Sequence, residues 1–302
     1  MKAGVGFLVA AMALTPVTDG LSKSLALEHS AFAVTFARYF MAGVVALLLS
    51  IILKKPLHIP RHDRLGQVWR TALMMGAMIL LISALSMVPL AKAVGGFLIA
   101  PVVASLISVL LFGERMDGYR FFGSALSFAG AFVILRPEGS FEAGTFMALA
   151  GGTLLGCYLA ATRRACTCGS LFSTLVTQSF LGAAMVAPLA FWNGIPQITL
   201  SDGLFVLALG AVSATCHFLT VAAYNRADAS ILSPFFYFNI VFAIPVGYFW
   251  FGEVPTVLTL LGLSGIATGG VVAMLSASRR ESIFSGVLAL PRNYARKYLL
   301  KV

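Results

Sequence analysis

The chain alternates between long apolar stretches and short polar segments from its first residues to about residue 276. A helix needs about 20 apolar residues to cross the hydrocarbon core of a bilayer. The pattern therefore predicts an all-α polytopic membrane protein with ten transmembrane helices. The expected helices cover residues 3–22, 33–53, 71–90, 94–113, 120–136, 145–162, 172–192, 203–224, 230–251 and 256–276.

The composition excludes a water-soluble globule. Hydrophobic residues make up 59% of the chain and charged residues only 11%, whereas soluble domains carry about 25% charged residues. The net charge of +10 does not indicate a nucleic-acid partner, because the basic residues lie between apolar stretches rather than on one face. The four cysteines lack the spacing of a metal site or a disulfide framework, so we expect no metal and no cofactor. They are Cys157, Cys166, Cys168 and Cys216.

The lysines and arginines predict the orientation. With a cytoplasmic N-terminus, 17 of the 21 basic residues fall in inside segments and 3 at outside ends. Cytoplasmic loops are normally rich in Lys and Arg. A different number of helices would remove this bias. We therefore expect a multi-pass protein of the bacterial inner membrane with both termini in the cytoplasm.

An internal repeat divides the chain. Phe112-Gly113-Glu114 recurs 139 positions later as Phe251-Gly252-Glu253, and the same offset carries Gly123 onto Gly262 and Gly130 onto Gly269. Because each half holds five helices, an odd number, the second half must enter the membrane from the opposite side. Two inverted five-helix repeats are a transporter architecture with the site near the midplane.

The repeated apolar-Gly-Glu, the ten expected helices and Arg38 early in the second helix resemble the drug/metabolite transporter superfamily with two EamA-type domains. The resemblance covers residues 1–137 and 138–277, followed by a basic cytoplasmic tail, 278–302, that could lie on the lipid surface. It implies a secondary transporter with a central cavity and peripheral fifth and tenth helices. The chain departs from the pattern at Ile240, where a proline matching Pro101 is often found.

The resemblance implies that the cargo is a small organic solute, a metabolite or vitamin moved by alternating access. Similar members include riboflavin and S-adenosylmethionine uptake proteins. The alternatives are an exporter of amino acids or drugs, an intramembrane enzyme and a non-transporting sensor. No Walker, Gly-x-Ser-x-Gly or His-Glu-x-x-His motif occurs in the sequence, so we expect neither ATP as direct driver nor these enzyme classes.

Ionisable residues inside membrane helices are functional candidates because they are costly there. Asp19 and Lys23 are four residues apart on the first helix and can pair, and Arg38 lies on the second helix. We expect these three on the outer cavity wall, where Arg38 contacts an anionic or carbonyl group and Asp19 balances it or binds a proton. The alternative is an ion cluster that only fixes the two helices together.

The matching second-half positions carry no charge, because Arg38 aligns with Gln178 and Asp19 with Cys157. Polar residues of the second half complete the predicted binding site. His217 could titrate near neutral pH, although a packing role is the alternative. These candidates are Tyr158, Gln178, His217, Tyr224 and Asn239.

Two further motifs have expected structural roles. Glu114 and Glu253 lie at helix ends, where we expect a turn role rather than solute binding. Gly152-x-x-x-Gly156 and Gly265-x-x-x-Gly269 permit close helix approach, and the second pair could serve a homodimer contact.

Overall fold

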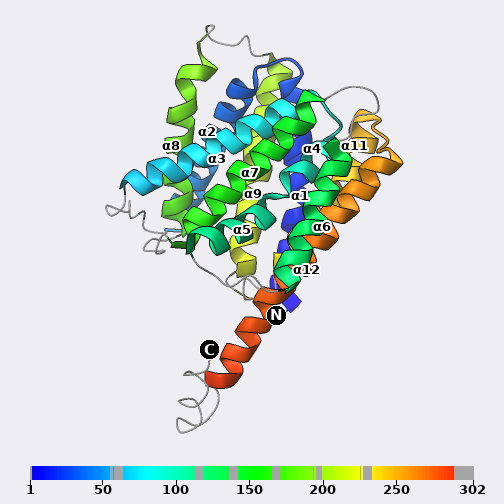
Figure 1. Ribbon diagram of the computed structural model, residues 1–302. Coiled ribbons are helices and arrows are strands. Elements are labelled where there is room, and N and C mark those ends of the chain that lie inside the picture. The colour runs from blue at the N-terminus through cyan, green and yellow to red at the C-terminus, as the bar shows by residue number, and fades with distance from the viewer. Residues whose placement is uncertain are drawn as a thin grey trace.

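The computed structural model describes residues 2–54, 57, 64–112, 118–135, 142–164, 171–192, 194, 199–224, 226 and 233–288. These residues are almost entirely helical and include no strand (Figure 1). The elements are α1 (Lys2–Ala26), α2 (Ala31–Ile52), α3 (Arg64–Leu85), α4 (Leu90–Phe97), α5 (Ala100–Phe112), α6 (Gly118–Leu135), α7 (Ala143–Arg164), α8 (Leu171–Ala190), α9 (Leu200–Tyr224), η1 (Ser233–Tyr237), α11 (Phe238–Phe251) and α12 (Val257–Leu288).

These elements confirm the predicted all-α fold with ten membrane spans. Helices α4 and α5 together make the fourth expected span, and η1 with α11 makes the ninth. Among the described residues, five helices are long and apolar enough to cross a membrane on their own, and five shorter apolar helices accompany them. The start of α1 and the later part of α12 lie at the same end of the bundle (Figure 1).

The predicted bounds of the third span were wrong. We expected 71–90, but α3 runs from Arg64 to Leu85 and α4 begins at Leu90. Pro89 precedes α4 in an extended conformation, because its ring fixes φ and suits a position just before a helix. At the other end, helix continues into the polar segment 64–70, because long cationic side chains can extend toward the polar region at the membrane surface.

The fourth and ninth spans are both discontinuous. Helix α4 ends at Phe97 and α5 resumes at Ala100, because Pro101 has no N–H to bond the carbonyl four residues earlier. In the second half, η1 gives way to α11 at Phe238, which the 139-residue offset relates to Ile99. The halves therefore share a break at equivalent positions, although Ile240 stands where Pro101 would recur.

The glycines of the tenth span contact another helix of the same chain. A Cβ at Gly269 would lie 2.5 Å from the carbonyl oxygen of Gly123, and one at Gly130 would lie 2.6 Å from that of Gly262. Helices α6 and α12 thus pack backbone to backbone, as small residues permit in membranes. Because Gly265 and Gly269 face α6, they are not available for the dimer contact that we considered for them. A homodimer stays a prediction.

Two groups of helices make up the body of the molecule. Helix α1 packs along α9 and α11, and α7 packs along α3, α4 and α5. The pairs α2–α8 and α6–α12 accompany these groups. We call the end at which α1 ends and α2 begins the α1–α2 end. There α4 contacts α11, whereas among the described residues α5 makes no comparable contact with α1, α9 or α11.

Candidate functional site

An ion pair joins α1 to α2 inside the bundle. The Nη1 of Arg38 lies 3.2 Å from Oδ1 of Asp19, and the side chains are 15% and 4% exposed. The apolar stretches of both helices bury these charges, and a buried charge requires a partner. The structure thus brings together two of the three charged residues that the sequence singled out.

Hydroxyl groups on α1 extend this pair, and sequence reasoning missed them. Arg38 also donates to Oγ of Ser22 at 3.3 Å and, more weakly, to Oγ1 of Thr18 at 3.5 Å. Both hydroxyls donate their own protons to backbone carbonyls of α1, which leaves lone pairs for Arg38. A signal was present in the sequence, because positions 18, 19 and 22 fall on one helix face.

Arg38 retains donor capacity. A guanidinium carries five N–H donors. Nη1 uses its two on Asp19 and Ser22, and Nη2 uses one on Thr18. In the part of the chain that the structure describes, Nε–H and one Nη2–H have no partner. These hydrogens can bind a carbonyl or an anionic oxygen without displacing Asp19.

Lys23 does not pair with Asp19 as the spacing predicted. Its Nζ contacts Oε1 of Glu253 and donates to the carbonyl oxygen of Val88 at 2.7 Å. Oε2 of Glu253 accepts the backbone N–H of Leu90 at 2.7 Å. Lys23 therefore belongs to a contact at the α1–α2 end rather than to the Arg38 cluster.

The Gly-Glu motif explains how Glu253 reaches this position. Gly252 ends α11 in the left-handed conformation with φ of 67°, which glycine adopts without steric cost. The N–H of Glu253 bonds the carbonyl of Gly247 at 3.1 Å, so the motif does form the turn that we expected. The turn also directs the Glu253 carboxylate at Lys23, a role that we did not foresee. The matching Glu114 lies outside the described residues.

The second half holds a neutral counterpart of the ion pair. The hydroxyl of Tyr158 on α7 and the amide of Gln178 on α8 are hydrogen-bonded at 3.1–3.2 Å. The internal repeat relates α7 and α8 to α1 and α2, and it aligns Gln178 with Arg38. An uncharged bridge thus stands where the first half has Asp19 and Arg38.

The remaining candidates have different surroundings. His217 of α9 has an exposed side chain, and Tyr39 of α2, next to Arg38, is half-buried. Asn239 is buried, and its Oδ1 has no partner among the described residues. The side chain of Tyr224 lies outside the described residues.

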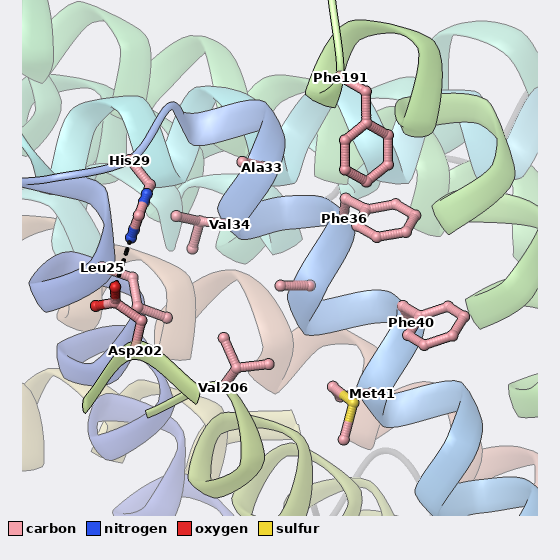
Figure 2. Close-up of a pocket in the computed structure, with 11 residues that line it drawn as sticks. Leu25, His29, Ala33, Val34, Phe36, Phe40, Met41, Phe191, Asp202 and Val206 are labelled. Carbon is pink, nitrogen blue, oxygen red and sulfur yellow. Dashed lines mark ion pairs between the residues drawn. The ribbon is translucent and has the colours of Figure 1, made fainter. Parts of the chain in front are cut away.

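An apolar pocket lies near the α1–α2 end (Figure 2). Phe36, Phe40 and Phe191 line one part of it, and the Nε2 of His29 lies 3.2 Å from Oδ2 of Asp202 at another. None of the predicted site residues lines this pocket.

The carboxylate of Asp202 belongs to the only described group with potential metal ligands, formed with Glu28 and His29, whose ligand atoms lie within 4.8 Å of one another. This carboxylate already accepts the backbone N–H and the hydroxyl of Thr199, and Thr199 caps the N–H of Asp202 in return. We interpret Asp202 as part of a capping box at the start of α9, with His29 as its neighbour.

Another ion pair lies at the α1–α2 end. Lys92 of α4 contacts Glu142, the residue before α7, whose side chain is 41% exposed. The hydrogen bond from Lys92 holds the pKa of the Glu142 carboxyl below its usual value. Both residues belong to the group formed by α3, α4, α5 and α7.

Comparisons with known proteins agree with this architecture. A riboflavin transporter of Rhizobium johnstonii is 28% identical over 66% of the chain and 67% of its own length. An S-adenosylmethionine uptake transporter of Rickettsia bellii is 23% identical over 86% and 89%. The pseudopaline exporter CntI of Pseudomonas aeruginosa is 26% identical over 93% and 98%.

A solved structure titled "Crystal structure of protein" matches with a TM-score of 0.67 at 21% identity, covering 91% of this chain and 97% of that one, and supports the fold alone. The pattern of the EamA-like transporter family matches the chain twice, over residues 2–136 and 142–275. Two matches in tandem agree with the 139-residue repeat. The chain therefore belongs to the EamA-like transporter family.

Proposed function

We propose that the chain carries a small organic solute with an anionic or carbonyl group across the bacterial inner membrane, and that Arg38 binds this group. The observation that carries the proposal is a guanidinium inside an apolar bundle, two of whose N–H donors have no partner among the described residues. A structural brace alone would use only the donors that face Asp19, Ser22 and Thr18. Spare donors in a low-dielectric interior are suited to a polar ligand.

The polar residues of the second half suit the uncharged part of the solute. Tyr158, Gln178 and His217 offer hydroxyl, amide and imidazole groups without a fixed charge. Tyr158 and Gln178 already bond to each other, and His217 has an exposed side chain. Asn239 adds a carbonyl oxygen that has no described partner. The proposed site therefore combines one cation with several neutral groups, as expected for a polar metabolite or vitamin.

The helix packing supports alternating access. The two helix groups meet at the α1–α2 end, and among the described residues α5 makes no comparable contact with α1, α9 or α11. If both termini are cytoplasmic, as the basic residues predict, the contact between the groups closes the outer side of the path. Inverted repeats can exchange their conformations and so produce the opposite opening.

The relatives suggest the solutes to test first. Their names give riboflavin and S-adenosylmethionine for uptake, and pseudopaline or amino acids for export. Counterflow in proteoliposomes measures exchange in either direction, so it identifies a solute before the physiological direction is known. We expect exchange of at least one of these solutes and its loss in Arg38→Lys, because a lysine lacks the planar fork.

The same reconstitution separates the alternatives. Chemical turnover without flux would favour an intramembrane enzyme, and binding without flux or turnover would favour a sensor. Fusion of a periplasm-active reporter to the C-terminus tests the orientation, and we expect it to stay inactive. Full exchange by Arg38→Lys would contradict the role of Arg38 while leaving transport established.

A further inference from the structure

The α1–α2 end is held by a two-point contact between the helix groups. Lys23 donates to the carbonyl oxygen of Val88, and Glu253 accepts the N–H of Leu90, each at 2.7 Å. Lys23 and Glu253 also pair with each other. We call these four groups the docking contact.

The docking contact is largely shielded from solvent. The side chains of Lys23 and Glu253 are 9% and 16% exposed. The ring of Phe251 covers the ammonium group at 5.3 Å from the ring centre. Hydrogen bonds that involve charged groups are stronger than neutral ones, and low solvent access strengthens them further.

The two charges match the polarity of the backbone that they meet. Leu90 is the first residue of α4, and Pro89 before it offers no side-chain cap. Helix N-termini present unpaired N–H groups and a partial positive charge, which favour a carboxylate. The Val88 carbonyl is a partial negative charge, which favours an ammonium. Each member of the pair therefore meets its complementary backbone group.

The ion pair itself lies within one helix group. Lys23 is on α1 and Glu253 follows α11, and these helices are in close contact because Gly20 admits Val246 and Trp250. Val88 and Leu90 belong to the other group. Separation of the two groups thus breaks both backbone hydrogen bonds but can leave the ion pair intact.

We propose that the Lys23–Glu253 pair is the gate that closes the α1–α2 end of the transport path by docking on the link between α3 and α4. The inference rests on the proposed function for its purpose, since a gate implies a path. Because the charges stay paired when the gate opens, opening never leaves an isolated ion in the membrane. It exchanges two hydrogen bonds with the backbone for two with water.

Labelling of a buried cysteine in nanodiscs tests the gate without any solute. The reporter is Leu90→Cys in a chain whose four native cysteines are replaced. The Leu90 side chain is fully buried, and its Cβ lies 3.7 Å from where a Cβ on Gly247 of α11 would be. A water-soluble maleimide can reach it only when α4 and α11 separate. Met87→Cys, at a 56% exposed position, checks the reagent.

We expect Glu253→Gln to raise the labelling rate of the reporter roughly ten-fold or more, the equivalent of losing one charge-assisted hydrogen bond. Lys23→Gln keeps Glu253 and its bond from Leu90, and should have the same effect if Glu253→Gln does not fold. Glu142→Gln is the matched control. It breaks an ion pair at the same end but within one helix group, so labelling should not change.

The charge exchange Lys23→Glu with Glu253→Lys decides between a gate and a brace. It preserves the ion pair but sets each charge against the wrong backbone group. We expect labelling as fast as in Glu253→Gln. Slow labelling in the exchanged protein, or no acceleration in either single variant, would overturn the proposal. If the variants accelerate labelling but the wild-type chain moves no solute, the contact holds the two helix groups together and the proposed function fails. If the wild-type chain moves solute but the variants do not change the labelling rate, the proposed function stands and the gate fails.

Discussion

Removal of one charge from the Asp19–Arg38 pair gives the sharpest test of the site. Arg38→Gln leaves the Asp19 carboxylate, with a side chain only 4% exposed, without its counter-ion. Asp19→Asn leaves the guanidinium in the same position. The double variant removes both charges and keeps two amides that can bond to each other, as Tyr158 and Gln178 bond in the second half.

The structure sets the size of the effect. Two unit charges at the 3.2 Å separation of Nη1 and Oδ1 attract by about 5 kcal/mol at an effective dielectric constant of 20. Breaking a buried pair from one side typically costs about 3–5 kcal/mol, because the remaining charge is uncompensated. We expect a loss of that order in Arg38→Gln and a loss of about 1 kcal/mol in the double variant, since neutral replacement of buried pairs is often tolerated.

Unfolding in SDS–detergent mixtures measures the stability of all four proteins, and solute counterflow measures their activity. We expect the double variant to regain stability but not exchange, because the solute loses the guanidinium. Recovery of both would reduce the pair to a brace between α1 and α2 and refute the proposed role of Arg38. A cost below about 1 kcal/mol in Arg38→Gln would refute the electrostatic reasoning itself.

Three further predictions concern the scaffold. Gly269→Val inserts a side chain between α6 and α12 and should lower the free energy of unfolding by about 1–3 kcal/mol. The control is Gly203→Ala, which should not lower the thermal midpoint because no atom lies within 4 Å of the added Cβ. Tyr158→Phe removes the hydroxyl between α7 and α8 and should destabilise by about 1–3 kcal/mol in the same assay. The pKa of the Glu142 carboxyl is lowered from 4.5, so its contact with Lys92 stabilises the folded protein above that pH. This stabilisation is lost as the pH falls through the lowered pKa, and it is under about 1 kcal/mol because Glu142 is partly exposed. Glu142→Gln should therefore abolish this part of the pH dependence of the free energy of unfolding.

Hydrophobic runs predicted the spans because a bilayer leaves few alternatives to helices. They were less informative about where helices break. The prediction placed the junction of the third and fourth spans near residues 90–94. In the structure the junction is residues 86–89, and Pro89 is its last residue. An averaged hydropathy window does not resolve a single proline. The second-half break after Tyr237 has no proline at position 240, and the proline nearest before it is Pro234, inside η1.

The charged site was predictable in part for a related reason. Asp19 and Arg38 stand out because ionisable residues are rare inside apolar spans. Their pairing across two adjacent helices follows from the short connection between α1 and α2. The partner of Lys23 was not predictable in this way. Glu253 is 230 positions further along the chain, and local spacing favoured Asp19, but closure of the whole fold brings Glu253 closer.

Each half connects its first two helices by a side-chain contact, and the chemistry of this contact differs between the halves. An ion pair joins α1 to α2, and a tyrosine–glutamine hydrogen bond joins α7 to α8. Conformational exchange between inverted repeats requires equivalent backbones, and both halves do break their fourth or ninth span at the same place. It does not require equivalent charges. Under the proposed function, the anionic or carbonyl group of the solute stays on the first half throughout the cycle while its neutral part faces the second. The charge-neutral second half is then the part to exchange when a different solute is to be carried.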